Sequence, residues 1–252
     1  MEYLEHLIAQ QQVLVGWQQA DLVPLRPWVV GLLGWLQRRL RLSAASLCLG
    51  IALLDRLLER NACARDHLRL LACACLLLAS KYCDDDESAT ARAVVHLQAA
   101  HFDQAELCAT ELNVLAALDH RVGAPTALDF AHQLAPLAND DALRGAVERL
   151  LCVALANAAT PQFAPLVVGL AALRHACALL DRAGLALSPL LAAVPSASCE
   201  RHLARCLEAQ QAAQAQQAAR GRTAAAASQA RDRSPVRRAP RRARRQPIAC
   251  KL

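Results

Sequence analysis

Three charged residues stand on the apolar stripes of predicted helices, where uncharged side chains are expected. Asp55 lies at the margin of a stripe with helical spacing that comprises Leu47, Ile51, Leu54 and Leu58. Lys81 takes the next position after the stripe Leu70, Ala74 and Leu77, and Glu111 interrupts the stripe Leu107, Val114 and Leu118. Charges inside a protein are costly unless they are paired or used at an interface. We therefore expect internal ion pairs or contacts with a partner protein.

Two other clusters have the residue types of metal ligands. Cys199, His202 and Cys206 share one helical face. Structural zinc usually takes four ligands from separated elements, so we interpret these residues as core. The acidic run Asp84–Glu87 has no turn that would arrange oxygen ligands around a hard cation, and we interpret it as a solvated loop. The sequence predicts neither a metal nor another cofactor.

The composition predicts an all-α protein of one or two domains. The chain has 252 residues, of which 55% are apolar, 3% are aromatic and nine are glycine. Leu and Ala favour helix, and no alternating run of strand length stands out. The apolar fraction is large enough to build a real core.

The cysteines and the apolar runs indicate a reducing compartment. The eleven cysteines are odd in number, lack the spacing of a disulfide framework and fall mostly inside predicted helices, so free thiols are expected. The longest apolar runs are shorter than the roughly 18–20 residues that span a bilayer. The first residues, MEYLEHLIAQQQ, lack the cationic start of a secretory signal.

The spacing of apolar residues and helix breakers predicts two helical units. A short helix over 2–12 is followed by five helices, near 25–40, 44–59, 65–81, 88–97 and 104–118. Pro125 after Gly123 ends this unit, and Thr126 is a candidate N-cap for about five more helices. The predicted parts are an N-terminal helical segment, two helical domains and a disordered tail: 1–20, 21–123, 124–216 and 217–252.

Five segments resemble the cyclin box in order and spacing: LRPWVV, LLDRLLE, LRLLACACLLLASKY, ELNVLAALDH and APTALDF. The resemblance is closest to D-type cyclins and covers about residues 3–215, more weakly in the second half. It implies tandem cyclin boxes, the second one degenerate. The residues that characterise cyclins are present at five positions: Arg26, Asp55, Leu70, Lys81 and Glu111.

The resemblance implies two roles for these charges. Arg26 and Asp55 would form an internal salt bridge between the first two helices of the box. Lys81 and Glu111 would face a kinase and hydrogen-bond its backbone, with Tyr3 and Leu7 of the N-terminal helix adding contact area. The residues alone leave a second interpretation open, in which Lys81 lies along the surface and pairs with Glu111 without any partner.

A further resemblance concerns the shallow patch with which several cyclins dock Arg-x-Leu motifs of substrates and inhibitors. The matching positions are Leu25, Trp28, Val29, Leu32 and Arg69. Pro27, Leu32 in place of the usual Trp, and a cationic Arg69 depart from the pattern and are expected to alter the patch. Either a modified docking patch remains, or Trp28 is a core anchor.

The tail combines charge with a modification motif. Residues 220–252 contain eleven Arg or Lys and one Asp, which leaves the rest of the chain mildly acidic within a net charge of +6. Ser234 lies in a Ser-Pro-x-Arg sequence that fits the preference of cyclin-dependent kinases. The alternative is that this Ser-Pro sequence has no regulatory use. The run RRAPRRARR predicts a nuclear import signal through Arg237, Arg238, Arg241, Arg242, Arg244 and Arg245, against the alternative of a solvated charge run.

The sequence therefore predicts a non-catalytic regulatory subunit that binds and activates a cyclin-dependent serine/threonine kinase and promotes cell-cycle progression. The chain lacks the Leu-x-Cys-x-Glu motif and the acidic C-terminal region of D-type cyclins, and such short forms are typical of herpesviruses, so a viral cyclin is the predicted subtype. We expect a kinase heterodimer in nucleus and cytoplasm, without membrane or nucleic acid. The alternatives are a cyclin-fold transcription factor and an adaptor that activates no kinase.

Overall fold

The computed structural model describes residues 2–11, 13–14, 16–84, 87–134, 140–157, 159–182 and 194–232. The chain divides into two units, 1–210 and 211–252. All regular elements among the described residues are helices, which confirms the predicted all-α class. None of the helices in these ranges is long and apolar enough to cross a membrane.

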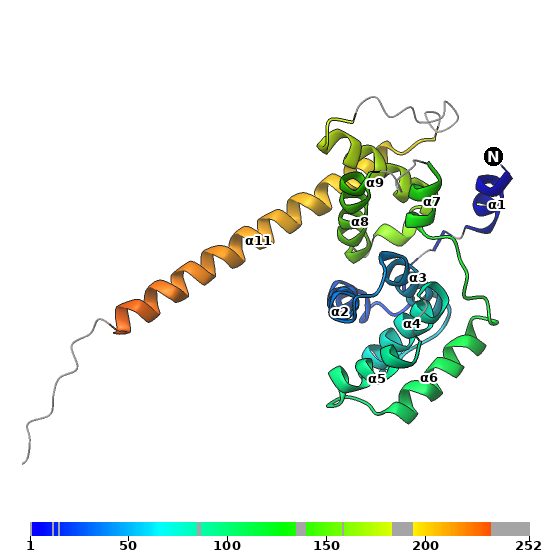
Figure 1. Ribbon diagram of the computed structural model, residues 1–252, viewed down its shortest axis with the longest axis horizontal. Coiled ribbons are helices and arrows are strands. Elements are labelled where there is room, and N and C mark those ends of the chain that lie inside the picture. The colour runs from blue at the N-terminus through cyan, green and yellow to red at the C-terminus, as the bar shows by residue number, and fades with distance from the viewer. Residues whose placement is uncertain are drawn as a thin grey trace, which may run out of the picture. The chain divides into compact units, whose positions relative to one another are not determined.

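The first helical bundle of the larger unit consists of the five helices that the sequence predicted. They are α2 Arg26–Leu40, α3 Ala44–Arg60, α4 Leu68–Cys83, α5 Glu87–Gln98 and α6 Gln104–Ala117. The chain enters α2 and α4 through two short 3₁₀ helices, Val23–Leu25 and Arg65–His67. Helix α4 is central, because it packs against α2, α3, α5 and α6 (Figure 1).

Local capping explains where these helices begin. The Ser43 hydroxyl accepts a hydrogen bond from the backbone N–H of Ser46 and caps α3. Asp103 and Glu106 form a reciprocal capping box at the start of α6.

Helices α3 and α4 approach each other closely at Gly50. A Cβ added to Gly50 of α3 would lie 3.1 Å from the Cα atom of Leu76 in α4. Gly50 thus allows the two central helices of the bundle to cross at short range.

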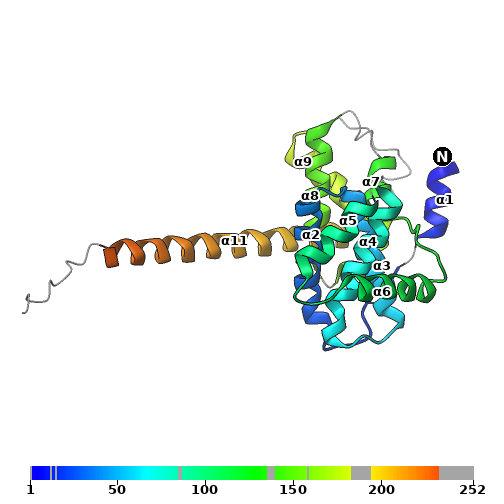
Figure 2. The ribbon, with the colours of Figure 1, turned by 60° about the horizontal axis from the view of Figure 1, so that its bottom comes forward.

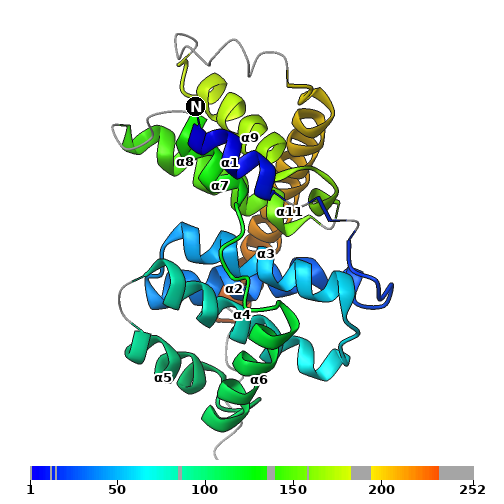
Figure 3. The same cartoon turned by 90° about the vertical axis from the view of Figure 1, so that its right-hand side faces the viewer.

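The second bundle lies beside the first and has its own core (Figure 3). Its described helices are α7 Ala127–Leu134, α8 Asp141–Ala156, α9 Pro165–Leu179 and the first part of α11 Ala197–Asp232. Residues 183–193 lie outside the described ranges, so the expected number of five helices here stays a prediction. The N-terminal helix α1, Glu2–Gln10, packs on this bundle through Leu7, which contacts Phe130 and Leu166.

Helix α11 is longer than predicted (Figure 2). It ends at Asp232, whereas the sequence analysis placed the start of a disordered tail at residue 217. Its sequence beyond Gln210 consists largely of Ala, Gln and Arg, which are strong helix formers, and this explains why the helix continues. The rest of the predicted tail lies outside the described residues.

Two helical glycines provide a matched test of the packing between α7 and α9. A Cβ at Gly169 would lie 2.3 Å from the carbonyl oxygen of Ala127, whereas one at Gly31 would meet nothing within 4 Å. We predict that Gly169→Ala lowers the free energy of unfolding by about 1–3 kcal/mol through overpacking. Gly31→Ala raises it by about 0.5–1 kcal/mol through helix propensity. Urea denaturation measures both, and equal effects would contradict the close approach.

Candidate functional site

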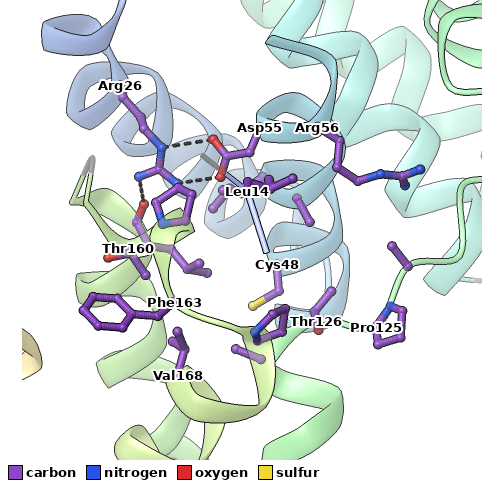
Figure 4. Close-up of a pocket in the computed structure, with 17 residues that line it drawn as sticks. Leu14, Arg26, Cys48, Asp55, Arg56, Pro125, Thr126, Thr160, Phe163 and Val168 are labelled. Carbon is purple, nitrogen blue, oxygen red and sulfur yellow. Dashed lines mark hydrogen bonds and ion pairs between the residues drawn. The ribbon is translucent and has the colours of Figure 1, made fainter. Parts of the chain in front are cut away.

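Asp55 is the acceptor at the centre of a buried hydrogen-bond network. Arg26 donates to its two carboxylate oxygens, from Nε at 3.0 Å and from Nη2 at 2.7 Å. Trp17, from the segment before α2, donates its indole N–H to the same carboxylate at 2.8 Å. All three side chains are buried. The pairing of Arg26 with Asp55 that the resemblance implied is therefore present (Figure 4).

Arg26 also reaches the second bundle. Its Nη1 donates to the carbonyl oxygen of Leu155 and, at 2.7 Å, to that of Asn157. These carbonyls belong to the end of α8, where backbone acceptors lack intrahelical donors and the helix dipole favours a cation. One guanidinium thus ties α3 of the first bundle to α8 of the second, a contact that the sequence analysis did not predict.

A small cavity of about 80 Å³ adjoins this network where the two bundles meet (Figure 4). Cys48 lines it, and burial raises the pKa of this thiol, so the reactive thiolate is disfavoured. Arg56 also lines it and donates to the carbonyl of Arg121 at 2.9 Å; burial and the neighbouring Arg60 and Arg121 lower its pKa. The lining is mostly apolar, and the hydroxyl of its Thr160 donates to the carbonyl oxygen of Ala154.

The second pair of charges lies at the surface of the first bundle. The ammonium of Lys81, in the last turn of α4, donates to Glu111 of α6 at 2.8 Å. The Glu111 side chain is only 8% exposed, whereas that of Lys81 is 35% exposed. The carboxylate thus fixes the position of a cation that solvent or a partner can still reach. The structure shows the internal pair, and contact of Lys81 with a kinase stays a prediction.

Two exposed apolar residues stand next to this pair in sequence. Tyr82 is 62% exposed and Leu112 is 68% exposed. A Cβ at Gly123 would lie 2.4 Å from the Tyr82 hydroxyl, so Tyr82 lies against the connection between the bundles. Exposed apolar side chains on the same two helices as a partly exposed ion pair are residue types found at protein interfaces. Neither residue was predicted as part of a site, although each directly follows a charged residue that was, Lys81 or Glu111.

The two residues of the N-terminal helix α1 that were expected to add contact area differ in exposure. Tyr3 is 58% exposed and remains available. Leu7 is buried among Phe130, Leu166 and their neighbours, so it anchors α1 to the second bundle. The prediction of Leu7 as a partner contact is therefore corrected: an amphipathic helix buries its apolar stripe, and here it does so within the same chain.

The residues of the predicted docking patch are not all at the surface. Val29 is fully buried, Leu25 and Leu32 are partly buried, and Trp28 is 47% exposed. The guanidinium of Arg69 stacks over the Trp28 ring at 5.0 Å and donates to Gln98 at 2.9 Å. Trp28 is thus no fully buried core anchor, while Val29 belongs to the core.

The other candidates show no ligand site. Cys199, His202 and Cys206 are buried, and within the described ranges no group of three potential ligands could hold a metal ion. His202 lies 3.1 Å from the Thr160 hydroxyl, and burial lowers the pKa of its imidazole and raises that of Cys199 to about 11. Ser234 and the arginines of the import motif lie outside the described residues, and their roles stay predictions.

Comparison with known proteins identifies a domain of this chain. Residues 2–123 match the model of the cyclin N-terminal domain. A rice protein (Oryza sativa subsp. japonica) described as cyclin-F3-2 is 34% identical over 84 residues, which are 33% of this chain. The chain spans only about a fifth of the length of this curated relative.

Solved structures show the same fold. A viral cyclin from herpesvirus saimiri superposes with a TM-score of 0.63 at 22% identity, over 74% of this chain and 85% of that one. A chain of the yeast RNA Pol II CTD kinase CTDK-1 complex superposes with a TM-score of 0.51 at 16% identity, over 64% and 56% of the two chains. The protein described here therefore contains a cyclin N-terminal domain over residues 2–123.

The buried ion pair predicts a large loss of stability when one partner is removed. Asp55→Ala leaves the Arg26 guanidinium buried without its counter-charge, and we expect the free energy of unfolding to fall by about 3–5 kcal/mol. The matched control is Asp66→Ala at an exposed position, which should change it by less than about 0.5 kcal/mol. Urea denaturation compares the two, and a similar small loss for both would contradict the role of Asp55.

Proposed function

We propose that this chain is the regulatory subunit of a cyclin-dependent serine/threonine kinase, and that it activates the kinase without catalysing any reaction itself. The observation that carries the proposal is the Lys81–Glu111 pair, in which the carboxylate is buried and the ammonium is 35% exposed. The likeness to a viral cyclin and to a chain of a kinase complex supports it.

The geometry suits recognition of a kinase backbone. A lysine ammonium has three donors, and Glu111 takes one of them, which leaves donors for carbonyl oxygens of a partner. Because Glu111 is buried and holds Lys81 in place, the partner need not pay the full cost of ordering a long side chain. Tyr82 and Leu112 supply apolar area that loses water on contact.

Activation then follows from differential binding. If the surface around Lys81 fits only the active position of the regulatory helix in the kinase, binding shifts the kinase population toward that state. The active state has the catalytic Lys–Glu ion pair formed and the activation loop released. The chain itself contributes contacts, and the partner supplies the active site.

The proposed subtype, cellular role and location rest on other parts of the chain. Promotion of cell-cycle progression and a viral subtype, acting in the host nucleus, are proposed from the short D-like sequence and its similarity in fold to a viral cyclin. The arginine run of 237–245 provides the proposed import signal. Ser234 is the proposed site of phosphorylation by the bound kinase.

A charge exchange separates the kinase contact from the internal ion pair. The chain is mixed with a panel of cyclin-dependent kinases, and histone phosphorylation is measured. Lys81→Glu should weaken kinase binding by about 2–5 kcal/mol, which is at least about 30-fold in Kd. The double variant Lys81→Glu with Glu111→Lys restores an ion pair, so it should unfold close to wild type in urea and yet fail to activate the kinase.

Two results would count against the proposal. Full activation by the exchanged variant would show that the pair serves the fold alone. No activation of any kinase by the wild-type chain would favour an adaptor or a cyclin-fold transcription factor instead.

The import signal has a separate test. Deletion of 237–245 removes six arginines from the tail and should abolish nuclear accumulation of a fluorescent fusion in transfected cells. Replacement of the same arginines by lysine, which keeps the charge, is the control and should accumulate normally. Unchanged accumulation after the deletion would remove the signal from the account.

A further inference from the structure

A groove of about 520 Å³ runs over the first turns of α4, between one face of α6 and the end of α3 with the connection that follows α3. Ligand sites in proteins typically have volumes of about 300–1,000 Å³. The floor of this α4 groove is apolar and consists of buried or partly buried residues: Leu57, Leu58, Leu70, Leu71 and Val114. They belong to the core of the first bundle or pack against it. The groove therefore gives a partner access to one side of that core.

The α4 groove and the proposed kinase contact lie on different faces of α6. Glu106, Thr110 and Asn113 line the groove at spacings of four and three residues, which places them on one side of the helix. Leu112, which belongs to the surface of the proposed kinase contact, is two residues from Thr110. It therefore points to the opposite side of α6, about 200° around the helix axis. A ligand in the groove leaves that surface free.

The lining decides between a helical and an extended ligand. An extended segment has backbone N–H and C=O groups that need partners when water is excluded, whereas a helix satisfies these groups within itself. The polar side chains of the lining stand at its edges, with Asn61 and His67 on one side and Thr110 and Asn113 on the other. The floor offers no hydrogen-bonding side chain. An amphipathic helix can cover such a floor without leaving its own polar groups unpaired.

The charge along the α6 edge favours a cationic side chain in the ligand. Glu106 is the only Asp, Glu, Lys or Arg among the described residues that line the groove. Its carboxylate accepts the backbone N–H of Asp103 at 2.9 Å, which leaves further lone pairs for a ligand. The sequence has no Lys or Arg between Arg92 and Arg121, and the opposite edge, 59–66, contains two arginines and two acidic residues. The α6 edge therefore complements a basic ligand and repels an acidic one.

We propose that the α4 groove binds an amphipathic helix of a partner protein that carries a basic residue at the border of its apolar face. Apolar side chains of this helix, at positions i, i+3 or i+4 and i+7, lie on the floor formed by Leu57, Leu70 and Val114. Its Lys or Arg pairs with Glu106. The binding is independent of the proposed kinase contact, because it uses another face of α6.

Two fluorescent, helix-forming peptides that differ in one residue test the charge preference. They are ALQAALAQLKAALQ and ALQAALAQLEAALQ, in which the leucines share one helical face and the variable residue borders it. Fluorescence polarisation with the full chain, without any kinase, should show the Lys peptide binding at least about fivefold more tightly than the Glu peptide. The Lys peptide with Pro in place of its central Ala cannot form the helix and should not bind.

Variants of α6 assign the binding to the groove. Glu106→Gln removes the charge and keeps a side chain that a capping box accepts, so both peptides should bind it equally. Glu106→Lys should reverse their order. Ala117→Arg places a long cation in the groove and should weaken the Lys peptide at least about tenfold. The matched control is Ala116→Arg, which is also exposed on α6 but does not line the groove, and it should bind like the wild type.

Further controls and contrary outcomes keep the test decisive. Lys81→Glu should bind the Lys peptide like the wild type, so failure of the kinase proposal leaves this result unaffected. Thermal melting verifies that each variant is folded, and Glu106→Gln alone carries the charge test if Glu106→Lys is not. Equal binding of the two peptides by the wild type, preference for the Glu peptide, or binding of neither would overturn the proposal. So would full binding of the Pro peptide, which indicates an extended ligand, or self-association of the chain that Ala117→Arg abolishes, which indicates a second copy.

Discussion

The two helical bundles depend on one buried guanidinium. Arg26 neutralises Asp55 within the first bundle and, with its remaining nitrogen, binds the carbonyl groups that end α8 in the second. The Coulombic attraction and the hydrogen bonds together compensate the desolvation of both charges, which neither would do alone. Trp17 adds the segment that precedes α2 to the same carboxylate. Removal of Asp55 would therefore loosen three parts of the chain together.

The packing of the helices next to this junction fixes the positions of charged side chains at the surface. Helices α3 and α4 cross closely at Gly50, and α4 carries Lys81 at its end beside Glu111 of α6. The same helix begins near Arg69, which stacks over Trp28 of α2. The central helix α4 thus carries Arg69 in its first turn and Lys81 in its last.

The sequence predicted the features that local periodicity and charge can express. The five helices of the first bundle follow from apolar spacing and caps, and the charges at Asp55, Lys81 and Glu111 stand out because they interrupt that spacing. The bond from Arg26 to α8 could not be predicted, since it joins residues more than a hundred positions apart through backbone carbonyls that carry no sequence signal. Leu7 was misplaced because an apolar stripe does not reveal which surface it covers.

Hydrogen exchange of the chain, measured alone and with each cyclin-dependent kinase of a panel, would locate the proposed kinase contact. We expect a kinase that the chain activates to protect amides in the last turn of α4 and around Glu111 in α6, while the amides of α2 exchange as in the free chain. Protection confined to the second bundle or to α2, in the presence of a kinase that the chain activates, would contradict it.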